Sequence, residues 1–185
     1  GTPGGGDVGL NVLMIQVDDN YGLSSTAALN IDVFAAPTIY EAEDAVYVGP
    51  NLDDTASGYT GTGYLNYNNS TGDYTEWTVN QGAGNYDIAF RYALYSSKSG
   101  RPLEIQVNGV VVEPLLVFPE TGSWDIWAYT ATLNVTLNAG DNTIRATTTG
   151  SNGANVDYLA VFDTGPQPNQ PPSFTADPIN EIDAT

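Results

Sequence analysis

Two glutamates in the segment "YEAED", Glu41 and Glu43, are spaced so that they could bind one cation together. On a β-strand, residues two apart project from the same face of the sheet. Like charges held this close are unfavourable unless a cation lies between them, and Ca²⁺ suits the pair because it takes about six to eight hard oxygen ligands. Asp157, in "NVDYL", is the third candidate ligand if the strands that carry these segments are neighbours. A solvated edge strand with two ordinary glutamates is the alternative.

A second group of candidates consists of aromatic residues outside the strand-like patterns. Tyr64 lies in "GYTGTGYLNY", and Trp124 lies in "ETGSWDIW", three residues before Trp127. Because residues three apart on a strand face opposite ways, we expect Trp127 in the interior and Trp124 in an exposed loop. An open Trp opposed by a Tyr would stack on the apolar face of a pyranose ring, and Asn155 would supply an amide for its hydroxyls. The alternative is that both rings are ordinary core residues.

One basic residue near these loops has two interpretations. Arg101, in "KSGRPLEI", could hold a sugar carboxylate or sulfate through two parallel hydrogen bonds. Because acidic residues outnumber basic ones, an ion pair with a neighbouring carboxylate is the simpler expectation for Arg101.

The composition excludes several classes of function. The 185 residues include no His and no Cys, which removes disulfides, thiolate or imidazole zinc sites and Ser-His-Asp relays. Four basic residues against 22 acidic ones give a formal charge of −18, which disfavours nucleic acids and anionic membrane surfaces as partners. No segment reaches the roughly 20 consecutive apolar residues of a membrane helix. Since Lys98 is the only lysine and cation binding or solvation explains the clustered acids better than acid–base catalysis, we expect a protein that is not an enzyme.

The alternation of apolar and polar residues predicts an all-β fold. "NYDIAFRYAL" places every second residue, from Tyr86 to Leu94, on one face. "LEIQVNGVVVE" carries Asn108 and Gly109 where a type I′ hairpin turn needs them. Short strands separated by turns, with no sustained stripe of helical period, predict an antiparallel β-sandwich of the jelly-roll type.

The chain divides into three pieces. In residues 1–36, "LNVLMIQVDD" and "TAALNIDVFA" predict an extra N-terminal β-hairpin, and because two strands cannot bury a core alone, this piece is expected to end a preceding β module. Residues 37–164 form the predicted sandwich. Residues 165–185 are Pro-rich at first and are expected to be a linker and the start of a following module. Both flanks resemble cadherin-like or immunoglobulin-like repeats of large secreted bacterial proteins.

The middle piece resembles carbohydrate-binding modules of family 35, in the same clan as family 6. The matching segments cover nearly all of residues 39–162 in the family's order: "YEAEDA", "SGYTGTGYLNY", "YTEWTVNQGAGNYDIAFRYA", "RPLEIQVNG", "FPETGSWDIWAY" and "LNAGDNTIRATTTGSNGANVDYLAVF".

The resemblance implies a secreted or cell-surface module that binds polysaccharide and is appended to the catalytic domain of a glycan-degrading protein. It implies a structural calcium held by Glu41, Glu43 and Asp157, and a ligand site formed by Tyr64, Trp124 and Asn155. Several modules of the family use a second calcium near the ligand loops, for which Asp53 and Asp54 in "PNLDDTASG" are candidates; the alternative is that these two acids are solvated. The strongly negative charge favours a neutral glycan, although calcium could bridge a uronate. The alternative function is a structural or adhesive spacer in a cadherin-like repeat protein.

Overall fold

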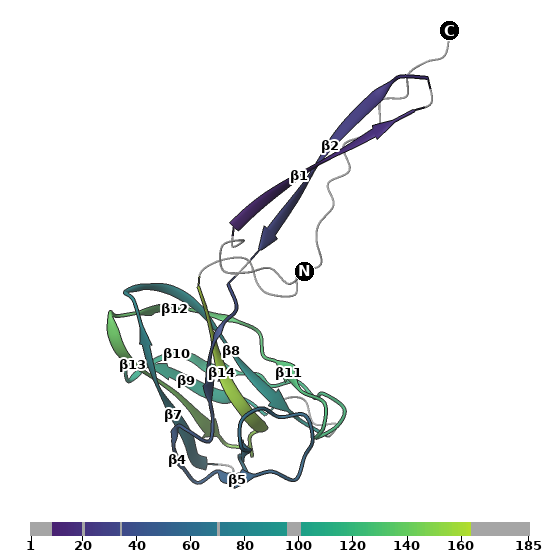
Figure 1. Cartoon of the computed structure of the whole chain (residues 1–185). Helices are drawn as coiled ribbons and strands as arrows, with labels where there is room; N and C mark the ends of the chain where they lie inside the picture. Colours follow the sequence, from purple (N-terminus) through teal and green to yellow (C-terminus); the bar gives the residue numbers. More distant parts are fainter. Residues whose placement is uncertain (1–8, 20, 34, 70, 96–100, 164–185) are drawn as a thin grey trace. The chain divides into compact units, whose positions relative to one another are not determined.

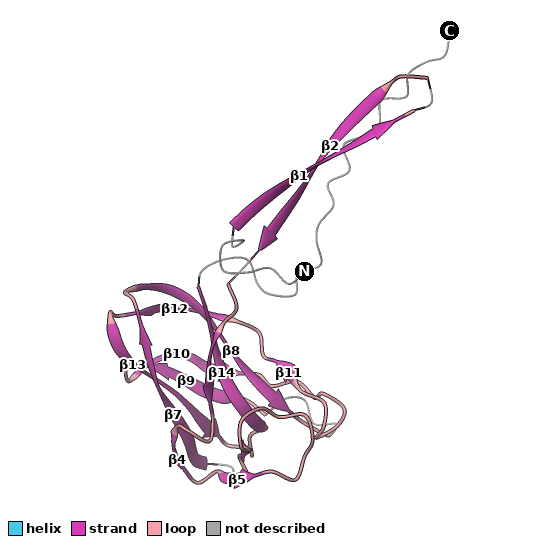
Figure 2. Cartoon of the chain, in the orientation of Figure 1, coloured by secondary structure: helices cyan, strands magenta, loops and turns pink. Residues whose placement is uncertain are grey.

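The computed structural model describes residues 9–19, 21–33, 35–69, 71–95 and 101–163 (Figure 1). All regular structure within these ranges is β-strand (Figure 2). None of the described residues forms a helix that is long and apolar enough to cross a membrane. The chain separates into two compact units: Pro37–Thr164 is one, and the terminal segments Gly1–Ala36 and Gly165–Thr185 make up the other. The C-terminal piece, 165–185, lies outside the described residues, so its interpretation stays a prediction.

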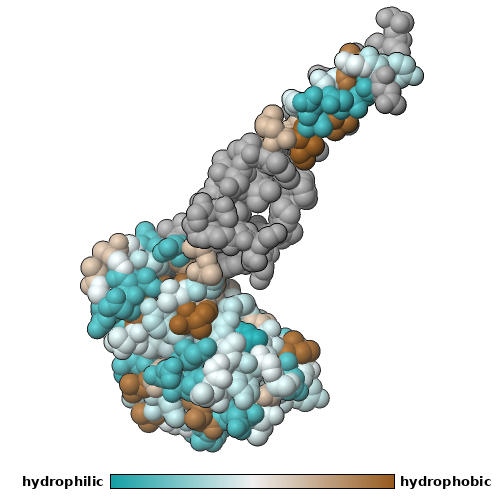
Figure 3. Space-filling model, in the orientation of Figure 1, coloured by the Kyte–Doolittle hydropathy of each residue, from teal (hydrophilic) through white to brown (hydrophobic). Residues whose placement is uncertain are grey.

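The predicted N-terminal hairpin is confirmed. Strands β1 (Gly9–Asp18) and β2 (Ser24–Val33) pair antiparallel in one continuous register. The Asp19 carboxylate shapes the turn, because its Oδ1 accepts hydrogen bonds from the backbone N–H groups of Tyr21 and Leu23, each at 2.8 Å. Apolar side chains of this hairpin are exposed (brown in Figure 3). That it ends a preceding β module remains a prediction.

The second unit is the predicted antiparallel sandwich. One sheet has five strands in the order β10 (Val110–Leu116), β9 (Leu103–Val107), β13 (Gly140–Thr149), β7 (Thr71–Gln81) and β4 (Val46–Val48). The other has the order β11 (Ala128–Tyr129), β8 (Gly84–Ala93), β14 (Asn155–Asp163), β6 (Tyr64–Asn66) and β5 (Asn51–Asp53), while β12 (Leu133–Leu137) also pairs with β8 and β3 (Thr38–Glu41) also pairs with β14.

The core lies between the two sheets and follows the predicted alternation. Ile88, Phe90 and Tyr92 on β8 are buried together with Leu94, which follows the strand. From the five-stranded sheet, Trp77 on β7 meets Phe90 with 5.6 Å between the ring centroids. Side chains from both sheets therefore fill one interior, as period-two patterning requires when each sheet buries one face.

The predicted type I′ turn joins β9 to β10. Asn108 and Gly109 have φ values of 51° and 78°, the left-handed conformation that both central positions of this turn demand. The Asn108 side chain also accepts a hydrogen bond from the Thr143 backbone N–H at 2.9 Å. The turn is thereby tied to β13, the neighbour of β9 in the sheet.

The first and last strands of the sandwich, β3 and β14, are neighbours, which was the condition for Asp157 to join the two glutamates. Tyr158 pairs with Glu41, and Val161 pairs with Thr38. The pairing of β14 with β8 shifts register between Val156 and Tyr158, so Asp157 lies at a β-bulge, which changes the direction of a side chain. The Asp157 carbonyl accepts a 2.9 Å hydrogen bond from the Ala42 backbone N–H. This pairing brings the glutamates and Asp157 to one place.

Candidate functional site

A groove with a volume of about 410 Å³ brings together the three residues proposed from the sequence for ligand binding. Tyr64 begins β6, Asn155 begins β14, and Trp124 lies in the loop before β11. Asp53, Arg101 and Asp125 also line this groove, which we call the loop groove. Residues far apart in the sequence thus converge at the ends of strands.

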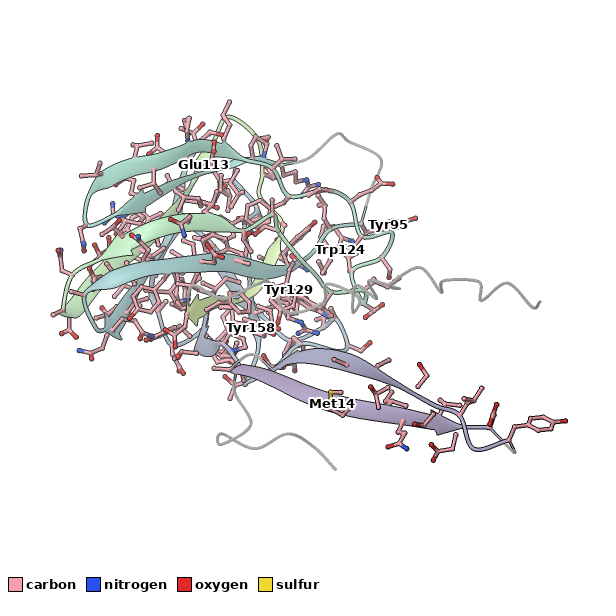
Figure 4. All side chains as sticks on the ribbon, turned by 90° about the horizontal axis from the view of Figure 1, so that it is seen from above. Met14, Tyr95, Glu113, Trp124, Tyr129 and Tyr158 are labelled. Atoms are coloured by element: carbon pink, nitrogen blue, oxygen red, sulfur yellow. The ribbon has the colours of Figure 1, made fainter. Side chains whose placement is uncertain are left out.

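Trp124 forms a half-buried wall of the loop groove. Its ring packs partly against the core and lies near Tyr95, with 6.5 Å between the ring centroids (Figure 4). The Arg101 guanidinium lies 5.8 Å from the Trp124 ring centroid, and its Nη1 donates a 2.9 Å hydrogen bond to the Gly153 carbonyl. A cation over the indole face stabilises one orientation of the ring.

The expected ion pair of Arg101 is not present among the described residues. Their two ion pairs are Arg91 with Asp157 and Arg145 with Glu76. Arg101 therefore brings to the loop groove a positive charge that forms no ion pair with a described carboxylate.

Tyr64 differs from the open ring expected at the rim. It is only 2% exposed, and its hydroxyl accepts a hydrogen bond from the Ala56 backbone N–H at 3.2 Å and lies 3.3 Å from the Thr55 hydroxyl. Asn155 is also buried, at 4% exposed. Both residues contribute to the floor of the loop groove, and Trp124 is the accessible ring.

The two tryptophans are both half-buried, whereas one interior ring and one exposed ring were expected. No strand covers the segment from Trp124 to Trp127, so strand alternation does not apply there. Trp127 is half-buried outside the main core, and its Nε1–H donates a 2.8 Å hydrogen bond to the Ser57 carbonyl. Its ring and the Tyr64 ring are arranged edge to face, with 5.3 Å between the ring centroids. Placing Trp127 in the interior was wrong, and Trp124 is the one that packs against the core.

Both acids of the loop groove are held in the charged form. Backbone and side-chain hydrogen bonds from Thr55 lower the pKa of Asp53, and backbone and side-chain hydrogen bonds from Ser57 lower the pKa of Asp125. The Asp125 Oδ1 accepts from the Ser57 N–H at 2.6 Å and from its hydroxyl at 3.1 Å. N–H and O–H donors favour a carboxylate over a carboxylic acid.

Glu41, Glu43 and Asp157 meet around residues 60–62, and we call these three acids the acidic cluster. Glu41 ends β3 and Glu43 lies in the turn that follows, so the same-face strand argument for the pair was wrong. They converge because Thr60 donates through its hydroxyl to Glu41 at 3.1 Å and through its N–H to Asp157 at 3.0 Å. Glu43 Oε1 accepts from the Thr62 N–H at 2.6 Å.

The acidic cluster carries more charge than its neighbours neutralise. Burial raises the pKa of Glu41, and the Asp157, Glu43 and Asp44 carboxylates act in the same direction. Burial also raises the pKa of Asp157, against hydrogen bonds from Thr60 and the charge of Arg91. Removing carboxylates from water disfavours their charged form unless a cation compensates.

The donor set of the acidic cluster fits a hard cation. Glu43 Oε2 is buried and has no hydrogen-bond partner among the described residues. A Cβ at Gly61 would lie 2.0 Å from Glu43 Oε1 and 3.2 Å from Glu41 Cδ, so the carboxylates close tightly on backbone here. In the described part of the chain, no three acids are already arranged as a metal site. One oxygen of Asp157 is engaged in an ion pair with Arg91.

Comparison with known proteins adds to this geometry. The model of the family described as "Carbohydrate binding module (family 6)" matches residues 41–163. The chain belongs to the carbohydrate-binding modules. A family 35 module from Clostridium thermocellum is 45% identical, with a TM-score of 0.65, over 69% of this chain and 98% of that chain. A family 35 module from Paenibacillus barcinonensis is 40% identical, with the same TM-score of 0.65, over 69% of this chain and 99% of that one. The resemblance to family 35 is confirmed.

The curated relatives are longer proteins that carry such a carbohydrate-binding module as one part. An exo-β-D-glucosaminidase from Amycolatopsis orientalis is 44% identical over 127 residues, which cover 68% of this chain and 12% of the enzyme. The chain therefore spans about an eighth of the length of this relative. In such enzymes the region similar to this chain is a small part of the protein.

Several residues around the loop groove and the acidic cluster had no signal in the sequence. Ser57 and Asp125 are 68 positions apart, and only the fold brings them together. Arg91 was assigned no role, yet it contacts Asp157 and donates to the Gly58 carbonyl at 2.9 Å. Its place on β8, next to β14, would have suggested it only once the strand order was known.

Proposed function

We propose that the Pro37–Thr164 unit is a non-catalytic module that docks a secreted or cell-surface glycan-degrading protein onto a polysaccharide. The observation that carries the proposal is that Tyr64, Trp124 and Asn155 line one groove in a chain of this family. The Trp124 ring stacks on a sugar ring, while Asn155 and the groove acids hydrogen-bond hydroxyl groups.

Calcium belongs to the same proposal. Glu41, Glu43 and Asp157 would hold it, with the buried Oε2 of Glu43 as the oxygen that most needs a partner. A bound Ca²⁺ supplies positive charge to the acidic cluster and accepts hard oxygen ligands. The residues of the chain fix the loop at 60–62 beside these ligands.

The pKa shifts support a binding role over hydrolysis. A glycosidase needs one carboxylic acid whose pKa is raised so that it can protonate the leaving group. The pKa values of Asp53 and Asp125 in the loop groove are lowered instead. The acids with raised pKa values, Glu41 and Asp157, are bound by Thr60 outside the groove lining.

The charges of the groove set the choice of ligands to test. The overall charge of −18 favours a neutral glycan. The charge of Arg101, however, makes uronate and sulfated polymers necessary arms of the same panel.

A polysaccharide panel tests the proposal directly. Affinity electrophoresis and calorimetry would be run with neutral, uronate and sulfated polymers, each with calcium and with a chelator. We expect binding of at least one polymer, and no release of reducing ends by the isolated chain. If no polymer binds in either condition, the spacer function is favoured; release of reducing ends would contradict a non-catalytic role.

A further inference from the structure

The loop of residues 55–62 reaches from the loop groove to the acidic cluster. It lies between β5 and β6 and contains no strand. Thr55 and Ala56 line the loop groove at its start, and Thr60 and Thr62 bind the acidic cluster at its end. We call this segment the bridging loop. Each of its ends is fixed by one of the two proposed sites.

At the groove end, the bridging loop is clipped to the segment that carries Trp124. Asp125, the neighbour of Trp124, accepts both the N–H and the hydroxyl of Ser57. Trp127 donates to the Ser57 carbonyl at 2.8 Å. All three polar groups of Ser57 are therefore engaged by residues 125 and 127. The position of the Trp124 wall depends on where Ser57 lies.

At the other end, Arg91 joins the acidic cluster to the middle of the bridging loop. One guanidinium nitrogen pairs with Asp157 and another donates to the Gly58 carbonyl at 2.9 Å. The guanidinium carbon also lies 5.3 Å from the Trp127 ring centroid. A shift of Asp157 thus reaches both the loop backbone and Trp127.

Glycine allows the bridging loop to fit this closely. Gly58 and Gly61 have φ values of +85° and +65°, a backbone conformation that is unfavourable for residues with a Cβ atom. A Cβ at Gly58 would meet Trp127 Cδ1 at 3.3 Å, and a Cβ at Gly61 would overlap Glu43. The loop backbone is therefore in direct contact with Trp127 at one point and with the acidic cluster at the other.

We propose that cation binding at the acidic cluster and glycan binding in the loop groove are energetically coupled through the bridging loop, with the Ser57–Asp125 contact as the link. This inference rests on the proposed function, because it takes both sites as real. A cation that fixes residues 60–62 reduces the part of the loop that glycan binding must still order. The entropy cost of glycan binding is then lower, so the binding of each ligand raises the affinity for the other. The two strengthening factors must be equal, because linkage is reciprocal.

Amide hydrogen exchange with calcium alone tests the coupling without any glycan. In the wild-type chain we expect calcium to slow exchange in residues 59–62 and also in residues 123–127. In Asp125→Ala we expect the first effect to remain and the second to disappear. Asp141→Ala is the matched control, since Asp141 accepts a side-chain hydrogen bond from Asn80 at 2.6 Å on β13, away from the bridging loop. Trp127→Phe serves as the second variant if Asp125→Ala fails to fold.

Calorimetry then measures the coupling as a ratio. The affinity for the tightest polymer of the panel should rise about fivefold or more when calcium replaces the chelator, and calcium affinity should rise by the same factor when the polymer is present. In Asp125→Ala both factors should approach one, whatever the direct loss of glycan affinity.

The outcomes separate the two proposals. Slowed exchange confined to residues 59–62 in the wild type would overturn the coupling and leave the calcium site intact. No change in exchange or melting temperature on adding calcium would overturn both the calcium site and the coupling, while glycan binding could still be measured in the panel.

Discussion

Two acids of the loop groove and two acids of the acidic cluster have pKa shifts of opposite direction. The pKa values of Asp53 and Asp125 are lowered because N–H and O–H groups of Thr55 and Ser57 donate hydrogen bonds to these carboxylates. The pKa values of Glu41 and Asp157 are raised because the effect of burial outweighs that of the hydrogen bonds they accept. Carboxylates in two environments thus differ in their tendency to carry charge. This difference agrees with the two roles that we propose: charged acceptors for hydroxyl groups in the loop groove, and oxygen ligands for a cation in the acidic cluster.

The largest expected effect comes from removing one oxygen of the acidic cluster. With wild type, calcium at about 100 times its Kd should add about 2.7 kcal/mol to the free energy of unfolding, a rise in melting temperature of roughly 5–10 °C. Glu43→Gln should lose most of that rise, because the buried Oε2 becomes an amide nitrogen or a weaker ligand.

Thermal melting with calcium and with a chelator measures this effect. Glu113→Gln is the control, since Glu113 lies on β10 and accepts from its own strand at Leu115. An equal calcium response in wild type and Glu43→Gln would remove Glu43 from the metal site.

The next effect is on the groove side. Trp124→Ala should weaken glycan binding by about thirtyfold, the loss expected for a binding hot spot of about 2 kcal/mol, and should leave the calcium-dependent rise in melting temperature in place. Calorimetry against the tightest polymer of the panel measures the loss. Tyr21→Ala, at a ring that is 92% exposed in the hairpin, should change nothing. Unchanged affinity in Trp124→Ala would exclude the loop groove as the glycan site.

A smaller effect is expected at Arg101. Arg101→Ala should lower affinity for a neutral glycan about two- to fivefold, since a cation–π contact contributes about 0.5–1 kcal/mol and here orients Trp124. Arg101→Lys keeps the charge without the planar stack. If the ligand is anionic, Arg101→Lys should retain more affinity than Arg101→Ala; equal losses would assign Arg101 to positioning Trp124 alone. Calorimetry of both variants distinguishes these results.

The smallest effect is a pH dependence of the groove. Because the pKa of Asp125 is lowered in the folded state, the contribution of its contacts with Ser57 is present above the ordinary Asp pKa and is lost as pH falls through the lowered value. Tryptophan fluorescence should therefore show a transition below the usual Asp range, and Asp125→Asn should remove it. The same transition in Asp125→Asn would show that another group causes it.

Much of the fold followed from local pattern. The alternation from Tyr86 to Leu94 and the Asn108–Gly109 turn both describe what neighbouring residues do, and sequence contains that information directly. The pairing of β3 with β14 was also anticipated, but only as the condition under which Asp157 could join the glutamates. The bulge that turns Asp157 toward them could not be anticipated, because it depends on the register of two strands against each other.

The site was harder to predict, because irregular segments have no period. Treating the segment around Trp124 and Trp127 as a strand led to the wrong burial for both rings. The position of Tyr64 depends on a hydroxyl that finds partners in Thr55 and Ala56, a contact within a loop that pattern cannot show. The conformation of the loops that bring Ser57 to Asp125 is determined only when the two sheets have fixed the positions of the loop ends.

The pairing of β3 with β14 has a mechanical consequence. Thr38 and Val161, at the entry and exit of the module, face each other across two antiparallel strands. Tension applied between the segments that precede Thr38 and follow Val161 would load this pair of strands from one end and break its hydrogen bonds one after another. The peeling would travel along the pair to Glu41 and Tyr158, where the carboxylates and Arg91 meet. A metal ion bound at that point, as we propose, would resist separation of the two strands at the hydrogen bonds that are loaded last.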